Sequence, residues 1–305
     1  MPDRCSVVDS AVKIGKLFGM TARRALLVAS LCFAWVALAE PAQADEAEVH
    51  YRLALSHKRE GRLGAAIQEA RTALGLRPAH AAARFTLGSL LRRTGDLEAA
   101  LGEFKKVIGQ SPGHAPAYAL AGAVALRLKR HTEARSLLEQ AIVLDPVDAS
   151  SVANLGSLLA RTGKSAEAID LLRAALERIP NDAGLHNNLG VALRRQRRYD
   201  EAVVALQRAV DLQPDSDRFL LNLAVSLRGG EQFARAVPAY VRLLARRPAH
   251  KGALYDLAAC YERLGRTTEA IDTYRKYIRV VRGSDPAAVA RVGERVRELQ
   301  RRSKP

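Results

Sequence analysis

Prolines recur in this chain at a fixed spacing of 34 residues, and this period limits the possible folds more than any other feature. They lie at Pro78, Pro112, Pro146, Pro180, Pro214 and Pro248. A series of alanines keeps the same spacing at Ala66, Ala100, Ala134, Ala168, Ala202, Ala236 and Ala270. A series of small residues keeps it at Ala54, Gly88, Gly122, Gly156, Gly190, Ala224 and Ala258. Three independent positions in one phase predict an array of seven structural repeats.

The residues within one period predict two helices. In the fourth period, one helical face carries Val152, Leu155, Gly156 and Leu159. After a break at Thr162-Gly163, a second apolar stripe is formed by Ala168, Leu172 and Ala175. Helical spacing of this kind marks a buried face, and a proline after the second stripe ends the helix. One such hairpin cannot bury its apolar face alone, so the core must come from stacking of neighbouring repeats.

The period and its small residues resemble the tetratricopeptide repeat over residues 47–284. The resemblance implies an all-α, right-handed superhelical solenoid of seven 34-residue helix-turn-helix repeats with a concave groove. The units are expected to start at Ala47, Ala81, Ala115, Ala149, Ala183, Asp217 and Lys251. The sixth unit departs most from the pattern, with Gly229-Gly230 at its turn and Pro238 in its second helix. A proline inside a helix costs about 3 kcal/mol, so we expect this unit to open first.

We expect three segments: a leader over residues 1–44, the repeat array over 45–284, and a capping helix with a tail over 285–305. In the last segment Asp285 can cap a helix whose first turn accommodates Pro286. Its apolar seam is expected at Val289, Val292, Val296 and Leu299. Such a helix would cover the exposed end of the array.

Residues 23–44 have the layout of a secretory signal. Arg23-Arg24 precede an uncharged apolar stretch at 25–39, and Ala42-Gln43-Ala44 offers a cleavage site before Asp45. Met20 is an alternative translation start to Met1. The apolar stretch is shorter than the roughly 20 residues that span a bilayer, which favours cleavage over an uncleaved inner-membrane anchor. We therefore expect a bacterial periplasmic or secreted protein.

The sequence contains no pattern typical of catalysis, metal binding or cofactor binding, so we expect no enzyme, metal or cofactor. His80, His114 and His250 each follow a repeat-ending proline by two residues and are expected to cap helices or lie in loops. Cys260, in a first helix, is expected to be a small core residue, since such a cysteine is seldom a nucleophile.

Two further periodic series suggest binding. Asn154, Asn188, Asn222 and Asp256 share the sixth position of the first helix. An amide both donates and accepts, and this row resembles the asparagine ladder in the groove of the O-linked N-acetylglucosamine transferase repeats, which implies contact with an extended peptide. The alternative is that the amides serve the fold.

The second series is Arg59, Arg93, Arg127, Arg161, Arg195 and Arg263, thickened by Lys58, Arg92, Arg194 and Arg228. Cations in the last turn of a helix complement its dipole, so the series has a structural explanation. The net charge of +16 also favours acidic partners, and an arginine edge along the groove would bind anions.

The sequence thus predicts a non-catalytic scaffold that binds protein or peptide segments in its groove. Envelope assembly, secretion or polysaccharide export are the roles that the resemblance implies. The alternative is a binder of acidic polymer or anionic lipid through the arginine edge, and no specific nucleic acid is expected. The sequence does not indicate an oligomeric state.

Overall fold

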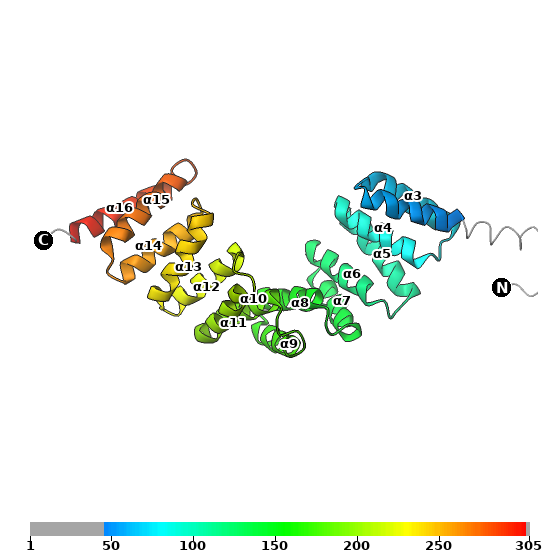
Figure 1. The fold of residues 1–305 in the computed structure, drawn as a ribbon, viewed down its shortest axis with the longest axis horizontal. Helices are drawn as coiled ribbons and strands as arrows, with labels where there is room; N and C mark the ends of the chain where they lie inside the picture. The colour runs from blue at the N-terminus through cyan, green and yellow to red at the C-terminus, as the bar shows by residue number, and fades with distance from the viewer. Residues whose placement is uncertain (1–45, 303–305) are drawn as a thin grey trace, which may run out of the picture. The chain divides into compact units, whose positions relative to one another are not determined.

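In a computed structural model the described chain, residues 46–302, consists of helices and the turns between them (Figure 1). A helix at residues 46–59 comes first. It is followed by α3 (Leu63–Leu76), α4 (Ala81–Thr94), α5 (Leu97–Gln110), α6 (Ala115–Arg127), α7 (His131–Leu144), α8 (Ala149–Arg161), α9 (Ser165–Arg178), α10 (Ala183–Arg195), α11 (Tyr199–Leu212), α12 (Asp217–Gly229), α13 (Phe233–Arg246), α14 (Lys251–Arg263), α15 (Thr267–Val281) and α16 (Pro286–Arg302). The prediction of an all-α chain built from consecutive helix pairs is confirmed. The leader, with its arginines, Met20 and Ala42-Gln43-Ala44, lies outside the described residues.

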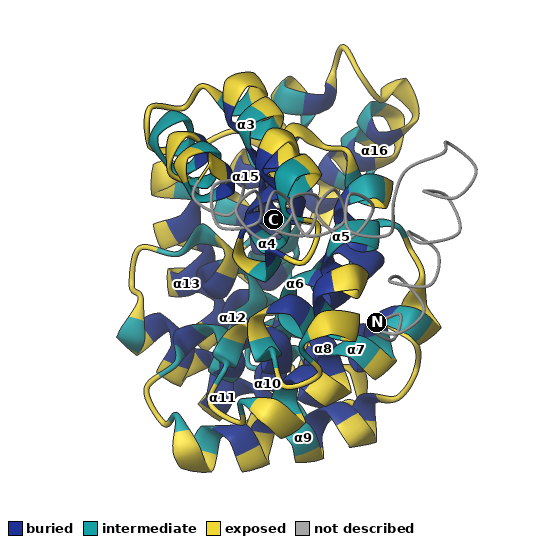
Figure 2. Ribbon diagram, turned by 90° about the vertical axis from the view of Figure 1, so that its right-hand side faces the viewer, coloured by how far each residue is buried: buried dark blue, intermediate teal, exposed yellow. Residues whose placement is uncertain are grey.

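The chain divides into two compact units between Val124 and Ala125. In the first unit α4 packs against α3 and α5. In the second unit each helix from α8 to α15 packs against the helices before and after it, and α16 packs on α15. Figure 2 shows buried and exposed residues alternating along each helix, as expected when one face of every helix is covered by its neighbours.

The helix pairs approach closely because small residues line the contact. All seven alanines of the series from Ala66 to Ala270 are fully buried. A Cβ added to Gly190 would lie 2.4 Å from Cγ of Leu206, and one added to Gly156 would lie 3.1 Å from Leu172. The spacing seen in the sequence therefore marks the line where the two helices of a repeat touch.

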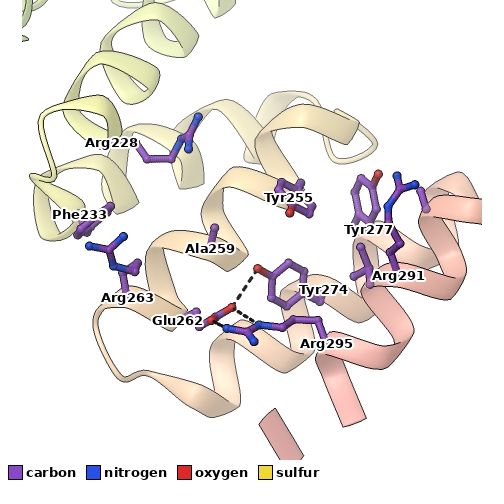
Figure 3. Close-up of a pocket in the computed structure, with 12 residues that line it drawn as sticks. Arg228, Phe233, Tyr255, Ala259, Glu262, Arg263, Tyr274, Tyr277, Arg291 and Arg295 are labelled. Carbon is purple, nitrogen blue, oxygen red and sulfur yellow. Dashed lines mark hydrogen bonds and ion pairs between the residues drawn. The ribbon is translucent and has the colours of Figure 1, made fainter. Parts of the chain in front are cut away.

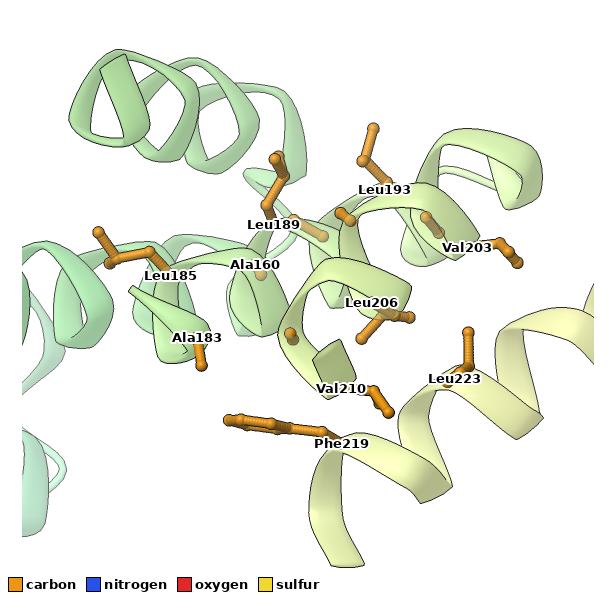
Figure 4. Close-up of a cluster of buried hydrophobic side chains, with 14 of the residues drawn as sticks. Ala160, Ala183, Leu185, Leu189, Leu193, Val203, Leu206, Val210, Phe219 and Leu223 are labelled. Atoms are coloured by element: carbon orange, nitrogen blue, oxygen red, sulfur yellow. The ribbon is translucent and has the colours of Figure 1, made fainter. Parts of the chain in front are cut away.

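A continuous core of buried side chains in the second unit runs from residue 125 to residue 260. Figure 4 shows its middle, where Leu206 and Val210 of α11 lie between α10 and α12. Phe219 and Leu223 of α12 approach α11 from the other side. Leu206 is fully buried and Phe219 is nearly so, which shows how each second helix joins two first helices into one core.

Each turn within a hairpin passes through a left-handed backbone residue at the same repeat position. Gly61, Gly95, Gly163 and Gly265 have positive φ there. Non-glycine residues hold the same conformation in the other three repeats: Lys129, Arg197 and Glu231, with φ of 60°, 59° and 58°. A side chain in this region carries a steric cost, so these three turns are strained relative to the glycine turns.

The first helices are capped by a side chain just before them, again every 34 residues. Nδ1 of His114 accepts from the backbone N–H of Ala117 at 3.1 Å, and Nδ1 of His250 accepts from that of Ala253 at 3.0 Å. His80 does the same toward Ala83 at 3.5 Å. The predicted capping role of these histidines is confirmed.

The irregular sixth unit has a packing reason for its glycines. A Cβ on Gly229 would lie 2.6 Å from Cε1 of Tyr199, and one on Gly230 would lie 2.9 Å from Cβ of that tyrosine. Pro238 lies inside α13, which continues to Arg246. The two glycines make room for a side chain of the preceding repeat, while Pro238 leaves one carbonyl of α13 without its helical donor.

The expected capping helix is α16. Asp285 accepts a hydrogen bond from the backbone N–H of Ala288 at 2.9 Å, as predicted for its cap. Val292, Val296 and Leu299 are buried as expected, while Ala288 is more deeply buried than Val289, which is only half-buried. The seam is therefore rotated slightly toward Ala288, and it packs on Ala270, Ile271 and Tyr274 of α15.

Candidate functional site

The first helices of the second unit lie side by side. α10 contacts α8 and α12, and α12 contacts α14. We call the surface formed by α8, α10, α12 and α14 the first-helix face. Because these helices are equivalent and adjacent, residues 34 apart form rows across this face. Asn154, Asn188, Asn222 and Asp256 form one such row, and each is half-buried.

The amides of this row join neighbouring first helices. Nδ2 of Asn188 donates to the backbone carbonyl of Ala153 at 3.1 Å. Nδ2 of Asn222 donates to Oδ1 of Asn187 at 2.7 Å, and Asn187 in turn donates to Oδ1 of Asn188 at 3.2 Å. Asn154 has no hydrogen bond to another described residue. Asn188 and Asn222 thus join neighbouring helices through their nitrogens. Oδ1 of Asn188 accepts one hydrogen bond from Asn187 and keeps a second lone pair, and Oδ1 of Asn222 keeps both of its lone pairs for a ligand.

Asp256, the last member of the row, belongs to a buried polar cluster. Its Oδ2 accepts from the Tyr240 hydroxyl at 3.1 Å, and its Oδ1 lies 3.5 Å from Nε of Arg228. Burial raises the pKa of the fully buried Tyr240, and the charge of Asp256 raises it further. Asp256 is therefore engaged within the fold and differs from the amides in what it can offer a ligand.

The predicted arginine series lies in the last turn of the first helices, and all six members are exposed. The four cations that were expected to add to this series are less exposed. Lys58, Arg92, Arg194 and Arg228 are half-buried, because their position faces the neighbouring helix. Burial lowers the pKa of Arg194, with Arg195 as the next cause, and no ion pair to Arg194 forms among residues 46–302. Within the second unit, Arg161, Arg195 and Arg263 are exposed at the ends of their helices, whereas the preceding Arg194 and Arg228 are half-buried.

A pocket of about 560 Å³ opens at the C-terminal end of the first-helix face (Figure 3). It is lined by Arg228, Phe233, Tyr255, Ala259, Glu262, Arg263, Tyr274, Tyr277, Ala288, Arg291, Val292 and Arg295. These residues come from α12 to α16, so the capping helix forms one wall. Of the residues predicted for the arginine edge, Arg263 and Arg228 line this pocket.

Ring contacts and one strong ion pair shape the pocket. The ring of Tyr255 lies edge-on to Tyr274 and Tyr277, with centroids 5.8 Å and 5.6 Å apart. Arg295 of α16 forms an ion pair with both oxygens of Glu262, which also accepts from the Tyr274 hydroxyl at 3.2 Å. Arg263 lies over the ring of Phe233, 4.7 Å from its centroid. Aromatic surface and guanidinium groups thus face the same space.

Sequence reasoning missed this pocket, although a signal was present. At the repeat position held by Leu138, Leu172 and Leu206, the sixth and seventh units carry Tyr240 and Tyr274. At the position of Arg194 and Arg228 the seventh unit carries Glu262. A buried hydroxyl needs a polar partner, so these changes at two repeat positions predict a local polar network at the end of the array.

Other kinds of site find no support in residues 46–302. No group of three or more His, Cys, Asp or Glu side chains is arranged to hold a metal ion there. None of the helices in this range is long and apolar enough to cross a bilayer. Cys260 is fully buried, as predicted, and burial raises the pKa of its thiol to about 11.

The repeats of this chain match a known family model. A tetratricopeptide repeat model matches residues 51–115, 104–149, 119–183, 154–217, 187–239 and 221–288. A comparison with the sequences of curated proteins gives no significant match.

Solved structures of similar fold are repeat proteins with low sequence identity. A tetratricopeptide repeat protein from Parabacteroides merdae is 14% identical, covers 84% of this chain and 97% of its own, and gives a TM-score of 0.61. MamA is 20% identical, with 56% and 93% covered and a TM-score of 0.52. YrrB, described as having an unusual peptide-binding site, is 24% identical, with 56% and 88% covered and a TM-score of 0.50. The family model spans most of the described helices and the packing agrees with it, so the chain belongs to the tetratricopeptide repeat family.

Proposed function

We propose that this protein is a non-catalytic scaffold that binds extended peptide segments of partner proteins on its first-helix face. Tetratricopeptide repeats generally bind protein partners, and YrrB, of similar fold, has a peptide-binding site. The observation that carries the proposal is the row of half-buried amides at Asn154, Asn188 and Asn222 across adjacent helices. Equal steps along one surface suit a ligand that itself repeats, as a peptide backbone does.

The hydrogen bonds of the row define which atoms can serve a ligand. Inter-helix bonds hold the nitrogens of Asn188 and Asn222, and so fix the orientation of both amides. A peptide in extended conformation presents backbone N–H groups, which the amide oxygens can accept. Such preorganised groups bind without losing much side-chain freedom, which favours affinity.

A peptide-display selection on the purified full-length chain tests the proposal, followed by calorimetry with a selected peptide. Asn154→Ala is the most informative variant, because it removes no hydrogen bond within residues 46–302. We expect it to weaken binding by about 0.5–1.5 kcal/mol while leaving the thermal melt unchanged. Thr72→Ala, a change on the exposed side of α3, is the matched control. If selected peptides bind and Asn154, Asn188 and Asn222 can all be replaced by Ala without loss, the row serves only the fold.

We further propose that the protein acts outside the cytoplasm, in the periplasm or secreted, in envelope assembly, secretion or polysaccharide export. The support is the leader pattern, with Arg23-Arg24, its short apolar stretch and Ala42-Gln43-Ala44. Intact-mass measurement of the exported protein tests cleavage before Asp45. A mass that retains residues 25–44 would make the segment an inner-membrane anchor instead.

The alternative function is binding of an acidic polymer or anionic lipid along the arginine edge. It is favoured by the exposure of Arg127, Arg161, Arg195 and Arg263 in the second unit. Binding of this kind falls steeply with salt, whereas binding through amide hydrogen bonds does not. Replacing Arg161 and Arg195 by Ala would abolish polymer binding and only slow the association of a peptide.

A further inference from the structure

The pocket at the end of the first-helix face has an excess of positive charge that the fold does not neutralise. Four arginines line it, and Glu262 is the only acidic residue in its lining. Both oxygens of Glu262 are already bound by Arg295, and the Tyr274 hydroxyl donates to one of them. Arg228 has Asp256 at 3.5 Å. The other two cations of the lining are Arg263 and Arg291.

Neither of these two is neutralised within the pocket. Arg291 is exposed and forms no ion pair with another residue among 46–302. Arg263 has Glu231 at 3.6 Å, but the two side chains are 58% and 73% exposed, and such a contact contributes little. The stacking of Arg263 on Phe233 holds its guanidinium at the rim. In Figure 3 Arg291 lies beside Tyr277, at the opposite side of the pocket from Arg263.

Between the two arginines the wall is aromatic. Tyr255 is 45% exposed although both Tyr274 and Tyr277 contact its ring. A large aromatic side chain left half open beside other rings offers an edge or face to a further ring. From one side of the pocket to the other, a ligand therefore meets the cation of Arg263, an aromatic surface and the cation of Arg291.

We propose that this pocket binds an acidic peptide segment that carries an aromatic residue. The carboxylates would pair with Arg263 and Arg291, and the aromatic side chain would pack on Tyr255 and Tyr277. The inference rests on the proposed function, because the peptide would be the end of a segment that lies along the first-helix face. A volume of about 560 Å³ accommodates a few residues of such a segment.

The aromatic wall separates this ligand from a simple polyanion. Inorganic phosphate or the phosphate of a lipid headgroup would use the arginines but would leave Tyr255 and Tyr277 without a partner. Guanidinium groups form paired hydrogen bonds with carboxylates, and burying a ring adds apolar contact that charge alone does not give. A ligand whose binding requires both the arginines and the aromatic wall is therefore the expected peptide.

The test uses three fluorescent probes with the full-length chain, read by anisotropy. The first is the peptide Glu-Asp-Phe-Asp-Glu, the second its amide analogue Gln-Asn-Phe-Asn-Gln, and the third Glu-Asp-Ala-Asp-Glu. We expect the first to bind, and the other two to bind at least about tenfold more weakly. The double variant Arg263→Gln/Arg291→Gln should bind the first probe with an affinity lower by about tenfold or more. Tyr255→Ala should reduce the preference for the phenylalanine probe over the alanine probe.

Arg279→Gln/Arg282→Gln is the matched control, because it removes the same charge from exposed positions outside the pocket. It should retain binding, and thermal melts should show all variants folded. The proposal is overturned if both double variants lose the probe equally, or if polyglutamate and heparin compete as well as the phenylalanine peptide does. If none of the probes bind while display-selected peptides do, and Asn154→Ala weakens those, this inference fails and the proposed function stands. If no peptide binds at all, both fail.

Discussion

The contact between the two helices of a repeat gives a sharp test of how this array is held together. Gly190 lies in α10 where α11 crosses it, and a Cβ there would lie 2.4 Å from Cγ of Leu206 and 3.0 Å from the carbonyl oxygen of Ala202. Leu206 is fully buried, so it has little room to move. The carbonyl belongs to the backbone of α11, so Gly190→Ala must push the two helices apart.

The magnitude follows from two opposing effects. Alanine is better than glycine inside a helix by about 1 kcal/mol. Overpacking a core of this density costs about 1–3 kcal/mol, and the backbone contact places Gly190 in the upper part of that range. We therefore expect Gly190→Ala to lower the free energy of unfolding by about 1–2 kcal/mol.

Two other glycines calibrate the experiment. At Gly156 a Cβ would meet only the side chain of Leu172, at 3.1 Å, so Gly156→Ala should be nearly neutral. At Gly293 in α16 the nearest atom is the end of Arg297 at 3.9 Å, so Gly293→Ala should stabilise by up to about 1 kcal/mol. Urea denaturation followed by circular dichroism gives all three values. If Gly190→Ala is as stable as Gly293→Ala, close helix contact at the repeat glycines does not limit the packing.

Further predictions concern the turns, the soft unit, the caps and the thiol. Arg197→Gly should raise the free energy of unfolding by up to about 1 kcal/mol, because Arg197 has positive φ; a loss of stability would contradict the strain argument. Hydrogen exchange should show residues 229–240 opening first among the internal units, whereas uniform protection over 183–270 would argue against a soft sixth unit. Burial, and then Arg77, lower the pKa of His80, so its contribution to stability is full above pH ~6.5 and is lost as the pH falls below it; His80→Asn, which keeps a cap, should flatten this dependence in urea titrations. Cys260 should resist iodoacetamide at pH 8 until the chain unfolds, and rapid labelling of the native protein would mean that the seventh unit opens.

The period determined which parts of the fold could be predicted. It placed the small residues at the helix contacts, the caps before the first helices and the proline turns, because these depend on local geometry that repeats. It could equally have shown that Lys129, Arg197 and Glu231 have positive φ, since glycine holds that position in the other repeats. The period could not show which side-chain atom of Asn188 or Asn222 forms a hydrogen bond with a neighbouring helix. A period gives the position of a side chain in its row, whereas a hydrogen-bond partner depends on the distance between neighbouring helices.

The pocket at the end of the array can be understood as the consequence of one change in the repeat. Where Leu206 fills the space between two helices, the next units place Tyr240 and Tyr274, whose hydroxyls reach beyond the apolar core. A buried hydroxyl needs an acceptor, which Asp256 and Glu262 supply. A half-buried carboxylate in turn needs a cation, and Arg228 and Arg295 approach these two. The polar cluster and the pocket beside it therefore depend on the tyrosines. Replacing Tyr274 by Leu should restore the ordinary repeat core, leave Glu262 with Arg295 alone, and alter the pocket without unfolding the array. A crystal structure of this variant with an unchanged pocket would show that the tyrosines are not the cause.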